Sequence, residues 1–190
     1  MPNNSQNRET QGIASIVGAT NTLHSVNPAT YPFWKSYVAA VGGPITEAAL
    51  RDAKDGVGFE SGVDLSSGVD FALLSDRGIR RRYADTLTSL KRFVNAESVK
   101  LHGGFTALMF DENPWFVDDQ SPIGQVTGLS LKDLFWAQLS DWDWMSDDGK
   151  VLKWDPRRDR YSAVLFKYSQ LGTTRRNSHF MLTGVTDDVR

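Results

Sequence analysis

The feature that most limits the possible folds is an apolar segment that leads directly into an amphipathic helix. Residues 69–74, Val-Asp-Phe-Ala-Leu-Leu, predict a buried strand. Ser75 comes next as the expected N-cap of a helix. In that helix Ile79, Tyr83 and Leu87 recur at helical spacing. A strand that passes straight into a helix indicates a mixed fold, and short strands dominate the second half of the chain, so we expect the α+β class.

A second helix is expected earlier, over residues 46–55. Thr46 has the right side chain for its N-cap, and Glu47 lies favourably in its first turn. Gly56 is expected to end it, and the glycines after it predict a loop as far as residue 68. The apolar patch 13–18 fits either a short strand or one turn of helix.

Short strands are expected after residue 103. The patterns predict strands over 105–110 and 115–117, joined by a turn, and one helical turn with a capping box over 130–133. Residues 135–154 predict a hairpin around Asp147-Asp148-Gly149.

Two further strands are expected near the end of the chain. Residues 161–168 are apolar on both faces, which is typical of a central strand, and 180–185 would form the return strand.

Composition excludes several function classes. The chain has 190 residues, of which 40% are hydrophobic and 23% charged, values typical of a globular protein. It has no cysteine, so disulfide frameworks, thiol catalysis and cysteine zinc sites are excluded. Its three histidines are far apart, and no apolar run is long enough to cross a membrane. We therefore expect no cofactor, no metal, no membrane partner and no enzymatic activity.

Charge is segregated along the chain. The net charge is +4 over residues 75–92, −7 over 108–155 and +4 over 156–190, although the whole chain carries only −2. Complementary patches on one chain suit a molecule that packs against copies of itself. For the basic helix face, which includes Arg77 and Arg80, a solvated surface or an ion-pair partner for the acidic region is favoured over phosphate binding.

The carboxylates between residues 141 and 148 allow two chemical interpretations. Asp141 and Asp143 lie on one face of a predicted strand, with Trp142 and Trp144 on the other. A cation site or a glycosidase pair is conceivable, but the calcium-loop pattern fails and no spacing specifies catalysis. Tryptophans in such regions more often anchor a core or an interface.

The order of these segments resembles that of tailed-phage and prophage major capsid proteins, which have the HK-ninety-seven-like fold. The matching segments, in chain order, are Asn27–Trp34, Val69–Ser75, Lys91–Phe93, Gly103–Phe110, Pro114–Asp118, Trp142–Trp144, Tyr161–Tyr168 and Arg175–His179. Position 113 is Asn where the family pattern has Gly, which a turn tolerates. Each motif alone is weak evidence for the family, whereas the occurrence of all of them in this order is more specific.

The resemblance implies a subunit of an icosahedral phage or prophage shell that self-assembles and encloses double-stranded DNA. It implies a peripheral domain, over 43–93 and 156–190, with a spine helix and long strands. It also implies an axial domain of short strands and helices over 94–155. Residues 1–42 would be a polar segment and an extended connector. The expected partner is a further copy of the chain, and scaffold, portal or other head proteins are possible additional partners. Packaged DNA would be contacted only non-specifically. The expected location is the virion and, during assembly, the host cytoplasm.

Family members begin with an N-terminal arm and an extended loop. Nothing in residues 1–12 resembles either, so the expectation is a fragment, a processed product or a degenerate copy. The sequence leaves two alternatives open: a hydrolase that uses Asp141 and Asp143, and a truncated capsid-like decoy or regulator.

Four residues are the predicted subunit contacts. Arg175 and Arg176 match the family's Arg-Arg-Asn segment and suggest an ion-pair site, with the alternative that they only end a strand connection. Trp142 and Trp144 are the weaker pair, because a place in the core of the axial domain would explain them equally well.

Overall fold

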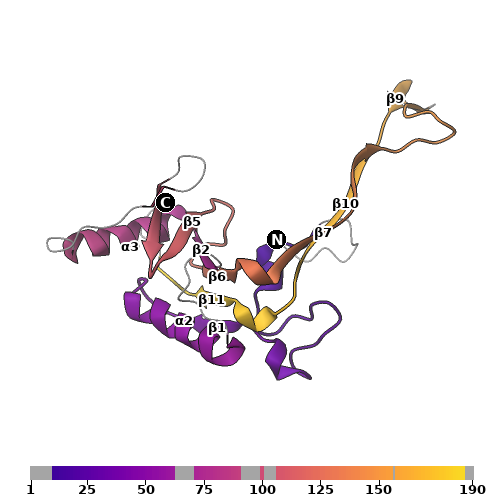
Figure 1. Ribbon diagram of the computed structural model, residues 1–190. Helices are drawn as coiled ribbons and strands as arrows, with labels where there is room; N and C mark the ends of the chain where they lie inside the picture. The colour runs from indigo at the N-terminus through magenta and orange to yellow at the C-terminus, as the bar shows by residue number, and fades with distance from the viewer. Residues whose placement is uncertain (1–9, 63–70, 91–98, 101–105, 156, 187–190) are drawn as a thin grey trace.

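The computed structural model consists of a compact body and a long two-stranded ribbon that projects from it (Figure 1). It describes residues 10–62, 71–90, 99–100, 106–155 and 157–186. Among these the helices are α1 (Ile13–Ile16), α2 (Glu47–Ser61) and α3 (Arg77–Leu90), with 3-10 turns η1 (Pro32–Trp34), η2 (Leu131–Asp133) and η3 (Arg176–Ser178). The mixed composition confirms the expected α+β class.

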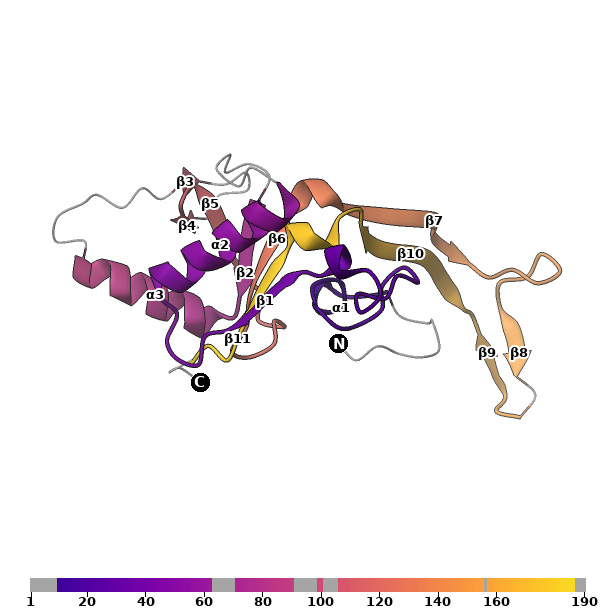
Figure 2. The ribbon, with the colours of Figure 1, turned by 90° about the horizontal axis from the view of Figure 1, so that it is seen from below.

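A seven-stranded mixed sheet forms the body, in the order β1-β11-β6-β2-β5-β4-β3. Its strands are β1 (Tyr37–Ala40), β2 (Phe71–Ser75), β3 (Val99–Lys100), β4 (Thr106–Phe110), β5 (Asn113–Val117), β6 (Val126–Ser130) and β11 (Phe180–Thr183). The pairs β1/β11 and β2/β5 are parallel, and the others are antiparallel. Both long helices share one hydrophobic core with this sheet (Figure 2).

The strand–helix unit lies at the centre of the body. The predicted buried strand over 69–74 is confirmed from Phe71 onward as β2, and residues 69 and 70 lie outside the described residues. Ile79 and Tyr83 of α3 pack into the core. The predicted N-cap is one residue early, because Ser75 still belongs to β2 and its hydroxyl accepts a 2.7 Å hydrogen bond from the indole of Trp115. Asp76 precedes the helix instead, and its carboxylate accepts from the Arg77 N–H at 2.7 Å.

Helix α2 begins where expected and ends later. The hydroxyl of Thr46 accepts from the Ala49 N–H at 3.2 Å, so the predicted N-cap is confirmed. The predicted end at Gly56 is wrong: the helix continues to Ser61, and Gly62 caps it with a left-handed φ of 63°. Residues 63–68 of the predicted loop lie outside the described residues. Gly56 lies against the ring of Tyr37, where a Cβ would overlap that ring, so close packing explains the glycine.

The turn between β4 and β5 confirms the expected break. Asp111 and Glu112 both have positive φ, 49° and 65°, as a two-residue hairpin turn requires. Asn113 is already in β5, and its side-chain amide donates to the Asp111 carbonyl at 2.9 Å. The position where the family pattern has Gly is therefore a strand residue here.

Strand β6 has no counterpart among the sequence-based expectations. Its five residues are all buried between β11 and β2. Gly128 faces the ring of Phe180, and a Cβ there would overlap that ring. A short segment with a central glycine has a weak strand signal, although the glycine is what lets the ring lie flat on the strand.

We expect Gly128→Ala to lower the free energy of unfolding by about 2 kcal/mol, because the added methyl group overpacks the core. Urea unfolding measures the loss. Gly43→Ala is the matched control, since a Cβ there meets no atom within 4 Å and φ is not positive. If Gly128→Ala and this control are equally stable, the packing argument is wrong.

The division into a peripheral and an axial domain stays a prediction. Strand pairing joins the two parts: β2, from the expected peripheral part, pairs with both β5 and β6 of the axial part. The predicted boundary at residue 155 lies inside a hairpin of the ribbon. No helix in the described part of the chain is long and apolar enough to cross a membrane.

Candidate subunit interface

The ribbon is built from two long strands that are far apart in the sequence. β7 (Leu134–Trp144) pairs antiparallel with β10 (Leu165–Thr173), from Leu134 opposite Thr173 to Trp144 opposite Leu165. The register shifts around Tyr168, as at a β-bulge. Beyond these strands a smaller hairpin forms the tip, β8 (Lys153–Asp155) with β9 (Arg160–Ser162).

This pairing corrects two expectations. The hairpin over 135–154 is wrong, because β7 pairs with β10 and β8 with β9. The turn at Asp147-Asp148-Gly149 is present, closed by a bridge between Asp147 and Lys150. The central strand over 161–168 is also wrong: the segment is split between β9 and β10, and its aromatic residues are largely exposed. The expected return strand over 180–185 forms as β11 (Phe180–Thr183), but it pairs with β1 and β6 of the main sheet rather than with 161–168.

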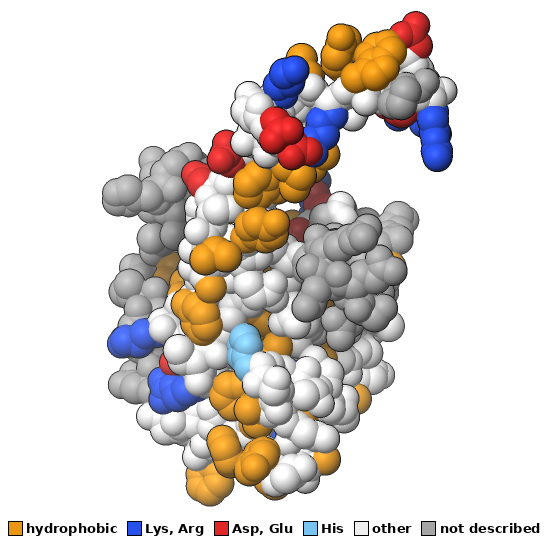
Figure 3. All heavy atoms as spheres, turned by 90° about the vertical axis from the view of Figure 1, so that its right-hand side faces the viewer, with side chains coloured by type: hydrophobic (Ala, Val, Ile, Leu, Met, Phe, Trp, Pro, Cys, Tyr) orange, Lys and Arg blue, Asp and Glu red, His pale blue; other side chains and the backbone are white. Residues whose placement is uncertain are grey.

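The ribbon exposes an unusual amount of aromatic surface. Trp142 is 64% exposed and Trp144 51%, so neither tryptophan belongs to a core within this chain. Within the described residues this pair of strands is a separate two-stranded sheet with no second sheet packed on it, which leaves these side chains open to solvent. Other exposed large hydrophobic side chains of the ribbon include Phe135, Trp136, Leu139, Trp154, Tyr161 and Tyr168. Figure 3 shows hydrophobic side chains following the ribbon outward.

Sequence reasoning did not single out Phe135, Trp136 and Leu139 as contact candidates. The signal was present, because five of the six tryptophans lie between residues 115 and 154. An exposed apolar strip of this kind marks an interaction surface.

Asp141 and Asp143, which alternate with Trp142 and Trp144 along β7, accept hydrogen bonds from groups close to them in the ribbon. The Asp141 carboxylate accepts from the Trp142 N–H at 2.9 Å and from Lys167 Nζ at 3.1 Å, and Lys167 also lies 5.7 Å from the centre of the Trp142 ring. The Trp142 N–H and Lys167 hold the pKa of Asp141 below its usual range. A glycosidase acid needs a raised pKa, so Asp141 does not fit the general-acid role of such a pair. Asp143 accepts from the Trp144 N–H at 2.8 Å.

Other charged groups of the acidic region also have partners. Asp147 accepts from Lys153 at 2.8 Å, and this hydrogen bond lowers the pKa of Asp147. Arg77 of the basic helix face pairs with Asp119 at 2.8 Å, which is the ion-pair role considered for that face. No group of three or more potential metal-ligating side chains occurs among the described residues.

The base of the ribbon is held by a buried carboxylate. Nε and Nη2 of Arg175 donate to the two oxygens of Asp133 at 2.9 and 3.2 Å, and Ser130 donates to it at 2.9 Å. Burial by itself raises the pKa of Asp133, but the hydrogen bonds from Arg175 and the neighbouring serines outweigh it, so the pKa lies below its usual range. The helical turn expected at 130–133 is present as the 3-10 turn η2, but the predicted capping box is wrong. The Ser130 hydroxyl caps no backbone N–H, because it donates to the Asp133 carboxylate instead.

His179 joins the ribbon base to the sheet from inside. Its side chain is fully buried, and Nδ1 accepts from the Ser130 N–H at 3.1 Å. Because a backbone N–H can only donate, Nδ1 carries no proton, and Nε2–H faces the Thr173 hydroxyl at 2.9 Å. Burial lowers the pKa of His179 to about 4, so the ring is neutral at pH 7.

Arg176 lies inside the chain, unlike its neighbour Arg175. It is fully buried, and its guanidinium donates to the Ile16 carbonyl at 2.7 Å, to the Asn21 carbonyl at 2.6 Å and to the Asn21 side chain. Burial lowers its pKa. These contacts fasten the N-terminal segment to η3 and favour a role within the chain, while a subunit-contact role for either arginine stays a prediction.

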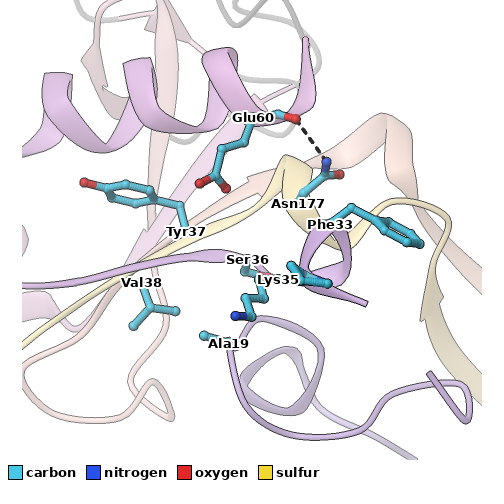
Figure 4. Close-up of a pocket in the computed structure, with 9 residues that line it drawn as sticks. Ala19, Phe33, Lys35, Ser36, Tyr37, Val38, Glu60 and Asn177 are labelled. Carbon is cyan, nitrogen blue, oxygen red and sulfur yellow. Dashed lines mark hydrogen bonds between the residues drawn. The ribbon is translucent and has the colours of Figure 1, made fainter. Parts of the chain in front are cut away.

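A surface pocket lies between η1, β1 and the end of α2 (Figure 4). Asn177, which comes directly after the two arginines, donates from its amide to the Glu60 carbonyl at 3.3 Å across one side. Of the described residues that line it, only Lys35 and Glu60 are charged.

The four predicted contact residues lie in two separate places. Trp142 and Trp144 are exposed on the ribbon, and Arg175 and Arg176 lie at its base.

Comparison with solved structures identifies the architecture. The chain is similar to a cyanophage A-1(L) capsid protein, with a TM-score of 0.63, 14% identity, and coverage of 92% of this chain and 58% of that one. It is also similar to the holo-SrpI encapsulin complex of Synechococcus elongatus PCC 7942, with a TM-score of 0.57, 14% identity, and coverage of 80% and 54%. The chain thus spans a little over half the length of these proteins.

No protein-family model matches the sequence, and no curated protein matches it significantly. The likeness therefore lies in the arrangement of strands and helices rather than in sequence. The superposition extends over 92% of this chain for the phage capsid protein and 80% for the encapsulin. The chain has the HK-ninety-seven-like fold of phage capsid proteins.

Proposed function

We propose that this chain is a structural subunit of an icosahedral phage or prophage shell, which assembles through contacts between copies and encloses double-stranded DNA. The observation that carries the proposal is the projecting ribbon with its exposed aromatic side chains on a capsid fold. The shell would be the virion capsid, assembled in the host cytoplasm. Scaffold and portal proteins would be further partners, DNA would be held non-specifically, and no catalytic step is involved.

The energetics of the ribbon suit this role. A tryptophan side chain buries about 150–250 Å² in a contact. At about 25 cal/mol per Å², full burial of such a side chain contributes several kcal/mol to the free energy of association. For Trp142 and Trp144 the contribution is smaller, because part of each side chain is already buried within the chain. Charged groups along the ribbon, such as Asp141 with Lys167, would set partner and register more than affinity.

We expect Trp142→Ser with Trp144→Ser to abolish assembly while the fold is retained. Both side chains are exposed, so the free energy of unfolding should change by less than about 1 kcal/mol. Size-exclusion chromatography with light scattering gives the mass of the full chain, and negative-stain images show rings or closed shells. Phe33→Ser is the matched control, since Phe33 is 67% exposed but lies on the body.

Rings or shells from the wild-type chain and the control, but not from the double variant, support the proposal. A wild-type chain that forms no particles contradicts the shell role. Particles from all three contradict the role of the ribbon tryptophans.

A further inference from the structure

The outer side of α2 carries a stripe that nothing in the described chain covers. Ala48, Asp52, Asp55 and Phe59 succeed each other at spacings of four, three and four residues, so they lie on one side of the helix. All four are exposed, and the buried residues of α2 lie on the opposite side. We call these four residues the α2 stripe.

The stripe combines an apolar side chain with two unpaired carboxylates. Phe59 is 93% exposed, the largest value among the exposed large hydrophobic residues described. Within the described residues, Asp52 and Asp55 make no side-chain hydrogen bond or ion pair, whereas Glu47 on the same helix pairs with Arg51. A phenylalanine beside free carboxylates suits a partner that is both aromatic and basic.

The tip of the ribbon has these complementary properties. Trp154 and Tyr161 pack edge to face with ring centres 5.1 Å apart, and both remain about half exposed or more. Arg157 and Arg158 lie in the connection between β8 and β9, and their guanidinium groups have no ion pair among the described residues. Two free arginines therefore stand beside an exposed aromatic pair.

The tip cannot reach the α2 stripe of its own chain. The two views place the tip at the far end of the ribbon, away from α2 (Figures 1 and 2). The eleven residues of β7 alone span about 35 Å at the usual rise of a strand. A contact between the two surfaces must therefore join two copies of the chain.

We propose that the tip hairpin of one copy docks on the α2 stripe of the next. Arg157 and Arg158 pair with Asp52 and Asp55, and the aromatic pair covers Phe59. Because the two surfaces differ, the contact is head to tail, and repeating it closes a ring or extends a filament. This proposal rests on the proposed function and names the surfaces by which neighbouring copies meet.

Charge reversal on either surface tests the contact. We expect D52K/D55K and R157D/R158D each to weaken self-association of the full chain at least about tenfold, because like charges then face each other. Sedimentation velocity over a concentration series measures the association, and urea unfolding checks that each variant is folded. Added salt should weaken the wild-type association, since the charges are exposed.

Mixing the two variants gives the most specific result. In the mixture, lysines on the stripe of one variant meet aspartates on the tip of the other, and the unchanged surfaces also match. Association should return to within about threefold of the wild type. Every contact then joins unlike copies, so rings with an even number of copies can close and five-membered rings cannot.

D85K is a matched control for the stripe variant, because Asp85 is an exposed aspartate on the other long helix. Its self-association should equal that of the wild type. If both double variants associate and build particles like the wild type, the contact is overturned and the shell proposal stands. The contact is also overturned if the mixture does not regain self-association, or if the wild type stays monomeric at about 1 mM. The shell proposal is tested separately, by whether negative-stain images show rings or closed shells.

Discussion

Replacing Arg176 by methionine is expected to lower the free energy of unfolding by about 3–4 kcal/mol. Arg176 is fully buried and donates to three oxygens of the N-terminal segment, two carbonyls and the Asn21 side chain. Methionine fills much of the volume but donates no hydrogen bond, so these acceptors lose their partner. A buried polar group left without a partner costs about 1–3 kcal/mol. Chemical denaturation followed by tryptophan fluorescence measures the loss.

Two further variants separate hydrogen bonding from charge. Arg176→Lys keeps the charge and restores part of the bonding, so an intermediate loss is expected, because an ammonium group cannot reproduce the planar fork. Arg81→Met removes an exposed arginine and should change stability by less than about 0.5 kcal/mol. If Arg176→Met is as stable as Arg81→Met, the N-terminal segment is not fastened by this side chain.

Acidification is expected to destabilise the chain through His179. Burial lowers the pKa of the folded-state ring to about 4, while an unfolded histidine has a pKa of about 6.5. Between these values the unfolded chain binds a proton that the folded chain does not, so the free energy of unfolding falls as the pH drops from 6.5 to 4. The loss across that window is about 3 kcal/mol. Urea unfolding at pH steps from 7 to 4 measures it.

His179→Asn provides the control for this pH dependence. Its side-chain oxygen can still accept from the Ser130 N–H, but it does not titrate. The variant should be less stable at pH 7 and nearly flat over the same range. Asp133 cannot produce the same fall in stability between pH 6.5 and 4. Its pKa is lowered in the folded chain, so the stability that it contributes is lost only at more acidic pH. An equally steep fall in the asparagine variant contradicts the assignment to His179.

Short-range features were predictable because neighbours in the sequence determine them. The Thr46 N-cap, the turn at Asp111-Glu112 and the buried strand β2 all depend on a few adjacent residues. Where a local rule failed, a distant side chain was the cause. Gly56 is inside the helix and leaves room for the Tyr37 ring rather than ending the helix, and the Ser75 hydroxyl accepts from Trp115 rather than capping α3.

The candidate interface was predictable only in part. The sequence indicated Trp142 and Trp144 but left open whether they lie in a core or at a surface, and only the ribbon geometry makes both exposed. Arg175 and Arg176 are adjacent and chemically alike, yet their surroundings differ. Arg175 is about half exposed and pairs with Asp133, whereas Arg176 is fully buried and donates to the N-terminal segment. No local pattern distinguishes two such neighbours.

The sequence by itself determined the α+β class, individual elements such as β2 and the start of α2, and the resemblance to the capsid fold, because residue preference and spacing act over a few positions. The tertiary structure alone decided that β7 pairs with β10 rather than folding back on 151–154, and that β6 lies between β11 and β2. The physical reason is that strand pairing and burial are properties of the assembled chain. Their free energy comes from contacts between segments far apart in sequence, and many registers satisfy the local pattern equally well.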